Sequence, residues 1–358
     1  MSSRLIVNSI RHSGASGDAV TLANDGTCTA NITNNLSNRN LIINGAMQVA
    51  QRGTSSTSNG HQTVDRYNMN SSGHDEAPTQ AQADVVAGTT PYASGFRKSL
   101  KITNGNQTSG AGAADRLRIL YIIEAQDIAN SGWNYTDSNS KITLSFWIKS
   151  SVSQNFYFRA TSSDVTSYNF PMETGVLTAN TWTKVTKTIS GNSNLTFNND
   201  NGIGLYIIFA LMRGTDNTDS GVALNTWAAT SSGTTLYPDF TTTWWTTNDA
   251  TWELTGVQLE VGSVATDFEH RSFGQELQLC KRYFQTGYIK KYENNTGIIA
   301  VSQNWAVQMR AAPTITGEQF ENQTDAIWSS VEITTKEAAS FYRNSNEICQ
   351  RWICNAEL

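Results

Sequence analysis

Charged residues are scarce in this chain. They make up 15% of its 358 residues, against about 25% in ordinary globular domains. Ser, Thr and Asn take much of the missing share, while aromatic residues reach 10% and include ten tryptophans. Thr and aromatic residues favour strands, and Asn and Ser favour turns, whereas a helical bundle would need more Ala, Glu, Lys and Leu. The composition therefore indicates a β-rich globular protein and argues against both a helical bundle and intrinsic disorder.

Long apolar runs and excess positive charge are also missing. The longest strongly apolar run covers Leu205 to Met212, far short of the roughly twenty residues that cross a bilayer. No apolar block near Arg4 is long enough for a signal peptide. The net charge is −5 and the pI is about 5.4, so bulk charge does not favour binding to nucleic acid or to an anionic membrane. We expect a chain that is made in the cytoplasm and does not insert into membranes.

Cysteine and histidine are too few and too scattered to predict a metal centre. No CxxC pair occurs, and the CxxxxC spacing of Cys349 and Cys354 has no second Cys or His pair nearby that would complete a zinc site. A disulfide between these two is the alternative to free thiols, which a reducing cytoplasm favours. The remaining members of the two sets are Cys28, Cys280, His12, His61, His74 and His270.

The length predicts two or three domains at about 150 residues each. Residues 40–271 contain many short stretches of alternating or apolar residues separated by Asn, Gly, Ser and Asp. In KITLSFWIK (141–149), every second residue is apolar, which indicates a strand with one buried face and with Trp147 as the exception on the polar face. This pattern predicts an antiparallel β-sandwich or jelly roll. The clearest strands are Arg116–Ile123, Lys141–Lys149, Asn155–Ala160, Trp182–Ile189, Gly204–Met212 and Trp252–Val261.

A linking helix is expected over residues 272–285, capped by Ser272 with Gln275 three residues on. Its expected apolar face consists of Phe273, Leu277, Cys280 and Phe284. Residues 286–358 then form a small C-terminal β domain, which is too short to bury a large core and is expected to pack on copies of itself or on the sandwich. Its expected strands are Gly297–Val301, Trp305–Met309, Ile327–Thr334, Ala339–Arg343 and Ile348–Ile353.

Residues 1–39 form a separate segment with two expected short strands. The apolar side chains that define these strands are Leu5, Ile6, Val7, Ile10, Val20 and Leu22. Turn residues surround them, including Asp25-Gly26. Such a short segment cannot hold itself together, so we expect it either to dock on another protein or on copies of itself, or to be a frayed tail.

Four stretches stand out as specific. They are NLIINGAMQVAQRG (40–53) with the DRY of residues 65–67, LSFWIKSS (144–151), LTGVQLEVGSVATDFEHRSFGQELQLCKRYF (254–284), and VQMRAAPTIT (307–316) with the AEL of residues 356–358. Together they resemble a family of bacteriophage virion proteins, the tail-fibre or receptor-binding proteins. The resemblance covers the chain from Asn40 onward. It implies a carbohydrate-binding-like jelly roll followed by a C-terminal trimerising domain.

The same resemblance implies a homotrimer in the virion, with residues 1–39 attaching to other virion proteins of the tail or capsid and the trimer binding a bacterial surface glycan. A decoration or spike protein without receptor binding and a glycan depolymerase are the alternatives. We expect binding rather than catalysis, because no acidic pair stands out and no GxSxG, HExxH or Walker-type motif is present. Glu269-His270 and the loop His74-Asp75-Glu76 place a histidine beside acids, and a structural role at the sandwich-to-helix corner is favoured for Asp267, Glu269 and Arg271.

Glycan binding needs an aromatic ring for stacking together with amide or carboxylate groups. The stretch TTTWWTTND (241–249) brings such groups together if one of its tryptophans is exposed, and neighbouring residues of a strand do point to opposite faces. The alternative places one tryptophan in the core and the other at a contact between subunits. The candidate glycan-binding residues are Trp244, Trp245, Asn248, Asp249, Tyr237 and Trp227.

No cofactor is expected. A structural calcium ion would need six to eight oxygen ligands. The oxygen-rich loops Asn198–Gly202 and Asp216–Asp219 are candidates for it, but they are typical of simple turns and neither matches the EF-hand spacing.

Overall fold

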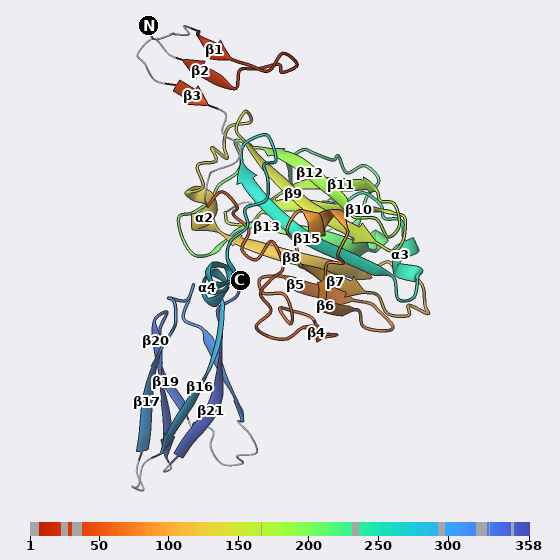
Figure 1. The fold of residues 1–358 in the computed structure, drawn as a ribbon. Helices are drawn as coiled ribbons and strands as arrows, with labels where there is room; N and C mark the ends of the chain where they lie inside the picture. The colour runs from red at the N-terminus through yellow and green to blue at the C-terminus, as the bar shows by residue number, and fades with distance from the viewer. Residues whose placement is uncertain are drawn as a thin grey trace, which may run out of the picture.

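The computed structural model describes residues 7–22, 28–30, 38–165, 167–230, 236–292, 298–319, 328, 330–344 and 347–358. They form a mainly β protein with a sandwich in the middle and a small β domain after it (Figure 1). This confirms the predicted fold class. None of the helices in the described ranges is both long and apolar enough to cross a membrane.

The sandwich contains two six-stranded antiparallel sheets, here called sheet I and sheet II. Sheet I has the strand order β14-β11-β10-β13-β8-β5. Its strands are β5 (Asn68–Ser72), β8 (Arg116–Glu124), β10 (Asn155–Ser162), β11 (Tyr168–Val176), β13 (Ile203–Arg213) and β14 (Ala228–Ala229). Sheet II has the order β12-β9-β15-β7-β6-β4. Its strands are β4 (Ser55–Ser56), β6 (Thr79–Asp84), β7 (Lys98–Thr103), β9 (Lys141–Ser150), β12 (Thr183–Ser190) and β15 (Thr251–Val261).

The core lies between the inner faces of the two sheets. The alternating apolar residues of β9 point into it, and Phe146 meets Phe158 and Phe209 of sheet I edge-on, with ring centroids 5.0 and 5.1 Å apart. Alternation therefore identified the buried face correctly, and all six strands predicted for residues 40–271 are present. Trp147, the exception on the outer face, packs at the surface beside the small cluster Ala46, Val85 and Phe96.

Helices are short and lie outside the sheets. They are α1 (Thr90–Ala93), α2 (Ala125–Ala129), α3 (Thr243–Thr246), α4 (Phe273–Lys281) and the 3-10 turn η1 (Thr215–Asn217). The predicted capping box of α4 is present, because the Ser272 hydroxyl accepts from Gln275 N and the Gln275 side chain accepts from Ser272 N. The predicted helix is too long at its end, since Phe284 already belongs to the next strand. Phe273 is 55% exposed and Leu277 is half-buried, so the predicted apolar face is buried only at Cys280 and Phe284.

The corner between the sandwich and α4 is fixed by charge, as predicted. The Glu269 carboxylate accepts hydrogen bonds from Asn38 N (2.6 Å) and Asn40 N (2.8 Å). Arg271 lies 3.5 Å from Glu269 and 3.6 Å from Glu276. These contacts tie the start of the sandwich to the turn that leaves it, which is a structural role.

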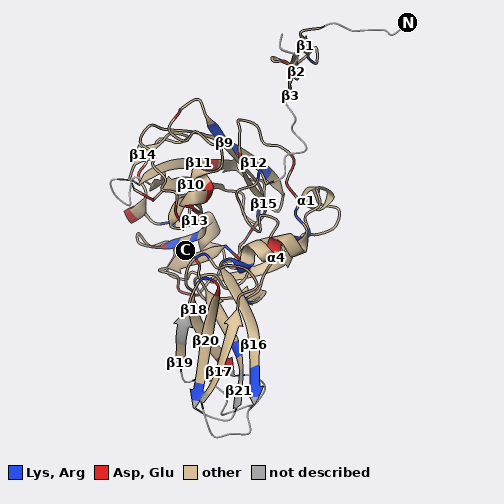
Figure 2. Ribbon diagram, turned by 90° about the vertical axis from the view of Figure 1, so that its left-hand side faces the viewer, with Lys and Arg blue, Asp and Glu red and all other residues tan. Residues whose placement is uncertain are grey.

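The C-terminal domain consists of two three-stranded sheets, β16-β21-β18 and β17-β20-β19. Figure 2 shows it from the side, extending away from the sandwich below α4. Its strands are β16 (Phe284–Tyr292), β17 (Ile298–Asn304), β18 (Thr314–Gln319), β19 (Ser330–Thr334), β20 (Ala338–Asn344) and β21 (Glu347–Asn355). The predicted strand Trp305–Met309 is wrong, because this stretch is a bend whose Trp305 indole donates to Thr335 O (3.1 Å). β16 and β18 were not predicted.

The N-terminal segment contains the sheet β1 (Ser9–Ile10), β2 (Val20–Leu22) and β3 (Cys28–Ala30). Ile10 is 54% and Leu22 41% exposed, and Figure 1 places this sheet apart from the sandwich. Leu5, Ile6 and the Asp25-Gly26 turn lie outside the described residues. Elsewhere, Cys280 and Cys354 are buried free thiols, so the alternative disulfide between Cys349 and Cys354 is not formed.

A buried ion pair joins the C-terminal domain to the sandwich. Arg66 of the DRY segment is 2% exposed and donates to the Glu357 carboxylate and to Ile122 O (2.6 Å). Its guanidinium stacks 3.4 Å from the centroid of the Tyr283 ring. The left-handed backbone of Arg66, with φ at 75°, is uncommon for a residue other than glycine, and the surrounding contacts hold it.

Further charges complete this joint. Arg52 donates to Glu357 (3.2 Å) and stacks 3.6 Å from the Phe284 ring. Glu124 of β8 accepts two hydrogen bonds from Arg282 (2.8 and 2.7 Å) and one from the Tyr283 hydroxyl (2.6 Å). Members of three of the four stretches that carry the family resemblance therefore meet at the joint, so their residues serve to fix the two domains against each other.

Removing one partner of the joint should destabilise the protein strongly. We expect Glu357→Gln to cost about 3–5 kcal/mol, because it leaves the Arg66 charge buried without its counterion. The matched control is Glu318→Gln, which breaks the exposed Arg351–Glu318 pair (2.7 Å) and should change stability by less than about 1 kcal/mol. Denaturant unfolding followed by tryptophan fluorescence checks both. Equal effects of the two substitutions would show that the joint pair does not hold the domains.

Acid should weaken the joint through His61. Its pKa is lowered to about 4, mainly by burial. Attraction by the Glu357 carboxylate opposes this shift, and repulsion by Arg52 and Arg66 adds to it. An unfolded histidine titrates near 6.5, so the stability that His61 contributes is complete above pH 6.5 and is lost as the pH falls toward 4. The loss amounts to about 3 kcal/mol.

This pH dependence has a direct test. The free energy of unfolding of His61→Gln should change less between pH 6.5 and 4 than that of the parent chain. His12→Gln, at an exposed position, should leave the pH profile unchanged. A parent-like profile in His61→Gln would contradict the assignment. Glu357 loses its charge at a lower pH than that at which His61 gains one. Burial raises the pKa of Glu357, but Arg66, His61 and Arg52 outweigh it and hold the pKa at about 2.

Candidate functional site

The predicted tryptophan pair is not a binding surface. Trp244 and Trp245 are 0% and 1% exposed and lie in α3. Both alternatives, an exposed tryptophan for stacking and a second tryptophan at a subunit contact, are therefore wrong. In a helical turn, neighbouring side chains differ by about 100° and do not point to opposite faces. Their indoles donate to Thr251 O (3.0 Å) and Gly110 O (3.1 Å), and Asn104 donates to the Trp245 carbonyl (2.5 Å).

The other predicted aromatic residues are buried as well. Trp227 is 9% exposed, donates to Ser190 O (2.6 Å) and packs on Phe170. Tyr237 is fully buried. Asn248 and Asp249 are exposed, in the turn that follows α3. These two polar residues therefore lack the exposed stacking ring that the glycan prediction required beside them.

The oxygen-rich loops and the acid–histidine loops use their side chains internally. Asp200 accepts from Gly202 N (2.8 Å) and Asp219 from Gly221 N (2.7 Å), as in ordinary turns. Asp75 accepts from Ser109 N (2.7 Å). The His270 ring packs between aromatic neighbours with Nε2 2.9 Å from Ser94 O. Among the described residues, no group of three or more His, Cys, Asp or Glu side chains is placed to hold a metal ion.

The outer face of sheet I brings together polar and aromatic side chains that sequence reasoning missed. Strand pairing aligns them in rows across the sheet. One row runs from Asn70 (β5) through Arg118 (β8) and Ala210 (β13) to Tyr157 (β10), and another runs from Tyr206 (β13) through Thr161 (β10) to Asn169 (β11). Their neighbours along each strand point into the core, so these residues share the outer face.

Two half-buried tyrosines lie on this face, and Phe240 packs edge-on against one of them, Tyr157. Tyr157 and Tyr206 lie on adjacent strands, four residues out of register, which places them about 13 Å apart along the strands. Partial burial raises the pKa of Tyr206, with Arg118 and Arg159 opposing it, so its hydroxyl stays protonated and can donate. Aromatic rings with a polar end, next to amides and guanidinium groups, supply both stacking and hydrogen bonding.

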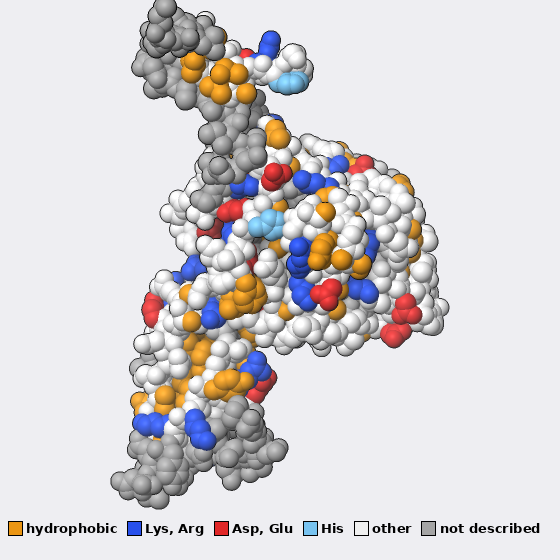
Figure 3. Space-filling view, viewed as in Figure 1, with side chains coloured by type: hydrophobic (Ala, Val, Ile, Leu, Met, Phe, Trp, Pro, Cys, Tyr) orange, Lys and Arg blue, Asp and Glu red, His pale blue; other side chains and the backbone are white. Residues whose placement is uncertain are grey.

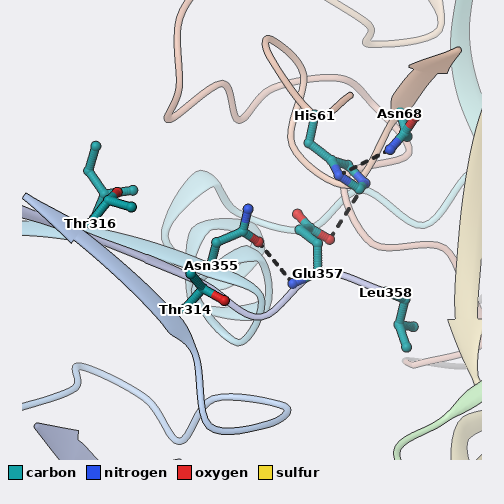
Figure 4. A pocket seen from close by; sticks show the side chains of 8 residues that line it. His61, Asn68, Thr314, Thr316, Asn355, Glu357 and Leu358 are labelled. Atoms are coloured by element: carbon teal, nitrogen blue, oxygen red, sulfur yellow. Dashed lines mark hydrogen bonds and ion pairs between the residues drawn. The ribbon is translucent and has the colours of Figure 1, made fainter. Parts of the chain in front are cut away.

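The outer face has a boundary at each end. At one end Leu236, Tyr237 and Phe240 fold over it and pack on Ala210 and Tyr157. At the other end it meets a polar cavity of about 420 Å³ at the joint, which Asn68 of β5 helps to line. Figure 4 shows His61 in this cavity between Asn68 (3.4 Å) and the Glu357 carboxylate (3.7 Å). The face is thus a bounded surface between a covering segment and the joint.

A second aromatic cluster reaches the surface on the side of sheet II. It consists of Ala46, Val85 and Phe96 with the partly buried Tyr92, Trp147 and Phe268. Figure 3 shows hydrophobic side chains gathered over α1, next to a histidine and bordered by basic side chains. The Arg97 guanidinium lies 3.8 Å from the Tyr92 ring centroid, so one face of that ring is already covered.

Burial of the tryptophan pair gives a testable prediction. Trp244→Ala should lower stability by about 3–5 kcal/mol, because it leaves a large cavity in the core. Asn248→Ala, four residues on and exposed, should change stability by less than about 0.5 kcal/mol. Thermal unfolding measures both. A Trp244→Ala chain of normal stability that had lost ligand binding would instead make Trp244 a contact residue.

Neither a protein-family model nor a curated protein matches this chain. Solved structures that resemble it include the enzymatically active domain of tailspike protein 4 from bacteriophage CBA120, at 8% identity and a TM-score of 0.33 over 62% of this chain and 21% of that domain. A CBM4 module gives 12% identity and a TM-score of 0.31 over 61% of this chain and 98% of the module. The family 11 carbohydrate-binding module from Clostridium thermocellum gives 10% and 0.27 over 61% and 98%. At these identities and TM-scores, the likeness assigns neither a family nor a function.

Proposed function

We propose that this chain is a bacteriophage tail-fibre subunit that binds host-surface glycans as a homotrimer. The observation that carries the proposal is the outer face of sheet I, where Tyr157 and Tyr206 lie with the half-buried amide-bearing Asn70 and the half-buried Arg118. This combination replaces the buried tryptophan pair as the candidate glycan site. Thr161 and Asn169 on the same face are buried and hydrogen-bonded to each other. The resemblance of residues 40–358 to phage receptor-binding proteins supports the assignment to a virion.

The two flanking parts supply the expected attachments. The N-terminal sheet exposes Ile10 and Leu22, which suits docking on another virion protein. The C-terminal domain has a small core of its own, and such a domain gains stability when copies associate. Both assignments follow the family resemblance.

Weak individual sites suit this role. Two half-buried tyrosines about 13 Å apart make few contacts with one sugar ring, so a single subunit should bind with low affinity. Three copies on one fibre, and several fibres on one particle, convert weak contacts into firm attachment through effective concentration. The chain's low charge leaves stacking and hydrogen bonding as the main attractions for neutral sugars.

A binding assay with matched variants tests the proposal. We expect the full chain to bind oligosaccharides of bacterial surface polysaccharides on a glycan array, and Tyr206→Ala to weaken that binding about 10-fold or more. Tyr92→Ala, in the aromatic cluster beside sheet II, is the matched control and should bind like the parent. An unchanged thermal midpoint in each variant shows that the fold is intact.

Two results would overturn it. If Tyr92→Ala weakened binding and Tyr206→Ala did not, the glycan site would lie on the other side of the sandwich. If the chain bound no glycan, and antibody against residues 286–358 marked the capsid shell of intact particles, the decoration role would replace the adhesive one.

A further inference from the structure

Four arginines gather on the outer face of sheet I, toward the end away from the joint. Arg116 and Arg118 come from β8, Arg159 from β10 and Arg213 from the end of β13. Arg116 and Arg213 are direct cross-strand partners, an arrangement in which like charges repel each other. In a chain with a net charge of −5, this is a local concentration of positive charge.

A β-bulge places the fourth arginine on this face. The register between β13 and β8 shifts between Ala210 and Met212. Leu211 and Met212 therefore both point into the core, and Arg213 turns outward to face Arg116. Regular alternation from Ala210 would have directed Arg213 inward. Bulges redirect side chains in this way and occur often beside binding sites.

Within the described part of the chain, these arginines have no carboxylate partner. The ion pairs found there belong to other arginines, to Lys98 and Lys149, and to His61. Arg159 and Arg213 are 6% and 4% exposed, and their Nε atoms, like that of Arg116, are buried without a hydrogen-bond partner. Arg159 donates to the neutral amide of Asn169.

The buried Tyr237 compensates this charge only in part. Its ring centroid lies 5.1 Å from the Arg159 guanidinium and 5.7 Å from that of Arg213, and its own hydroxyl has no partner among the described residues. The pKa of Arg213 falls to about 10, first because of burial and then, against the effect of Tyr237, because of the neighbouring arginines. Buried charges without counterions destabilise a fold, so stability does not explain this cluster.

We propose that the arginine cluster binds the oxyanion of an acidic saccharide, a carboxylate or sulfate ester group. This inference rests on the proposed glycan-binding function and names the class of glycan. The half-buried Arg116 and Arg118 contact the anion, and the more deeply buried Arg159 and Arg213 add positive charge behind it. A guanidinium group presents paired N–H donors that match the oxygens of such an anion.

The position of Arg118 suits this role. Its Nε donates to Asn70 Oδ1 (3.2 Å), which orients the guanidinium group, and its other nitrogens have no hydrogen bond to the described residues. Arg118 shares a row with Tyr157, two strands away, at about 10 Å. Leu236 and Tyr237 cover Ala210, which lies between Arg118 and Tyr157 in the row. An oligosaccharide with an acidic group on Arg118 would therefore stack a sugar ring on Tyr206, which lies four residues from Ala210 on β13.

The experiment uses calorimetric titration of the full chain with three oligosaccharides of equal length: an oligouronate, its carboxyl-reduced neutral form and a sulfated neutral form. The parent should bind at least one acidic form about 10-fold more tightly than the neutral form. The comparison between carboxylate and sulfate identifies the anion. Added salt should weaken the binding of the acidic ligand and leave the binding of the neutral ligand unchanged.

Two variants carry the test. In Arg118→Gln, affinity for the acidic ligand should fall about 10-fold or more, with neutral binding retained. Its thermal midpoint should stay equal to the parent's or rise, because an unpaired charge is removed, whereas a purely structural arginine would lower it. Lys184→Gln, on the outer face of β12 in sheet II, should bind all three ligands like the parent.

The outcomes separate this inference from the proposed function. Equal affinity of the parent for acidic and neutral ligands, or equal losses for both in Arg118→Gln, would overturn the anion site and leave glycan binding in place. Failure of the parent to bind any oligosaccharide would overturn both.

Discussion

The placement of the C-terminal domain depends on one buried ion pair. Arg66 and Glu357 are separated by 291 residues, so their contact closes a very long loop against considerable chain entropy. Arg310 reinforces it by donating to the carbonyls of Ala356 (2.7 Å) and Asn201 (2.8 Å). A charge buried this deeply tolerates few alternative partners. It therefore sets the position of the C-terminal sheets on the sandwich more specifically than an apolar contact would.

Much of the fold could be predicted from the sequence because the sandwich strands alternate cleanly. KITLSFWIK and the apolar run of β13 identify their own buried faces. β16 and β18 escaped prediction because polar residues dominate them and each carries a glycine, Gly287 and Gly317. A Cβ atom added at Gly287 would clash with the Trp352 side chain, and one added at Gly317 would clash with Gln350. Sequence patterns do not reveal this packing requirement. Trp305 has the apolar character of a strand residue but lies in a bend.

The candidate site was less predictable than the fold. TTTWWTTND has strand-like composition, and only the structure shows the helical turn that buries both tryptophans. Arg116, Arg118, Tyr157 and Arg159 alternate with core residues in their own strands, so their shared direction was readable. What the sequence could not provide was the register that brings β5, β8, β13 and β10 into common rows, or the bulge that turns Arg213 outward.

The separation of Arg66 from Glu357 also imposes an order on synthesis. Ribosomes add about 5–20 residues per second, so Arg66 emerges roughly 15–60 s before the carboxylate that neutralises it. The last strand of the sandwich ends at Val261, so for roughly the final 5–20 s of that interval the sandwich has all of its strands while Arg52 and Arg66 lack Glu357. The docking surface for the C-terminal domain is therefore complete before its occupant exists, and nascent chains display a transient cationic patch until translation reaches residue 357.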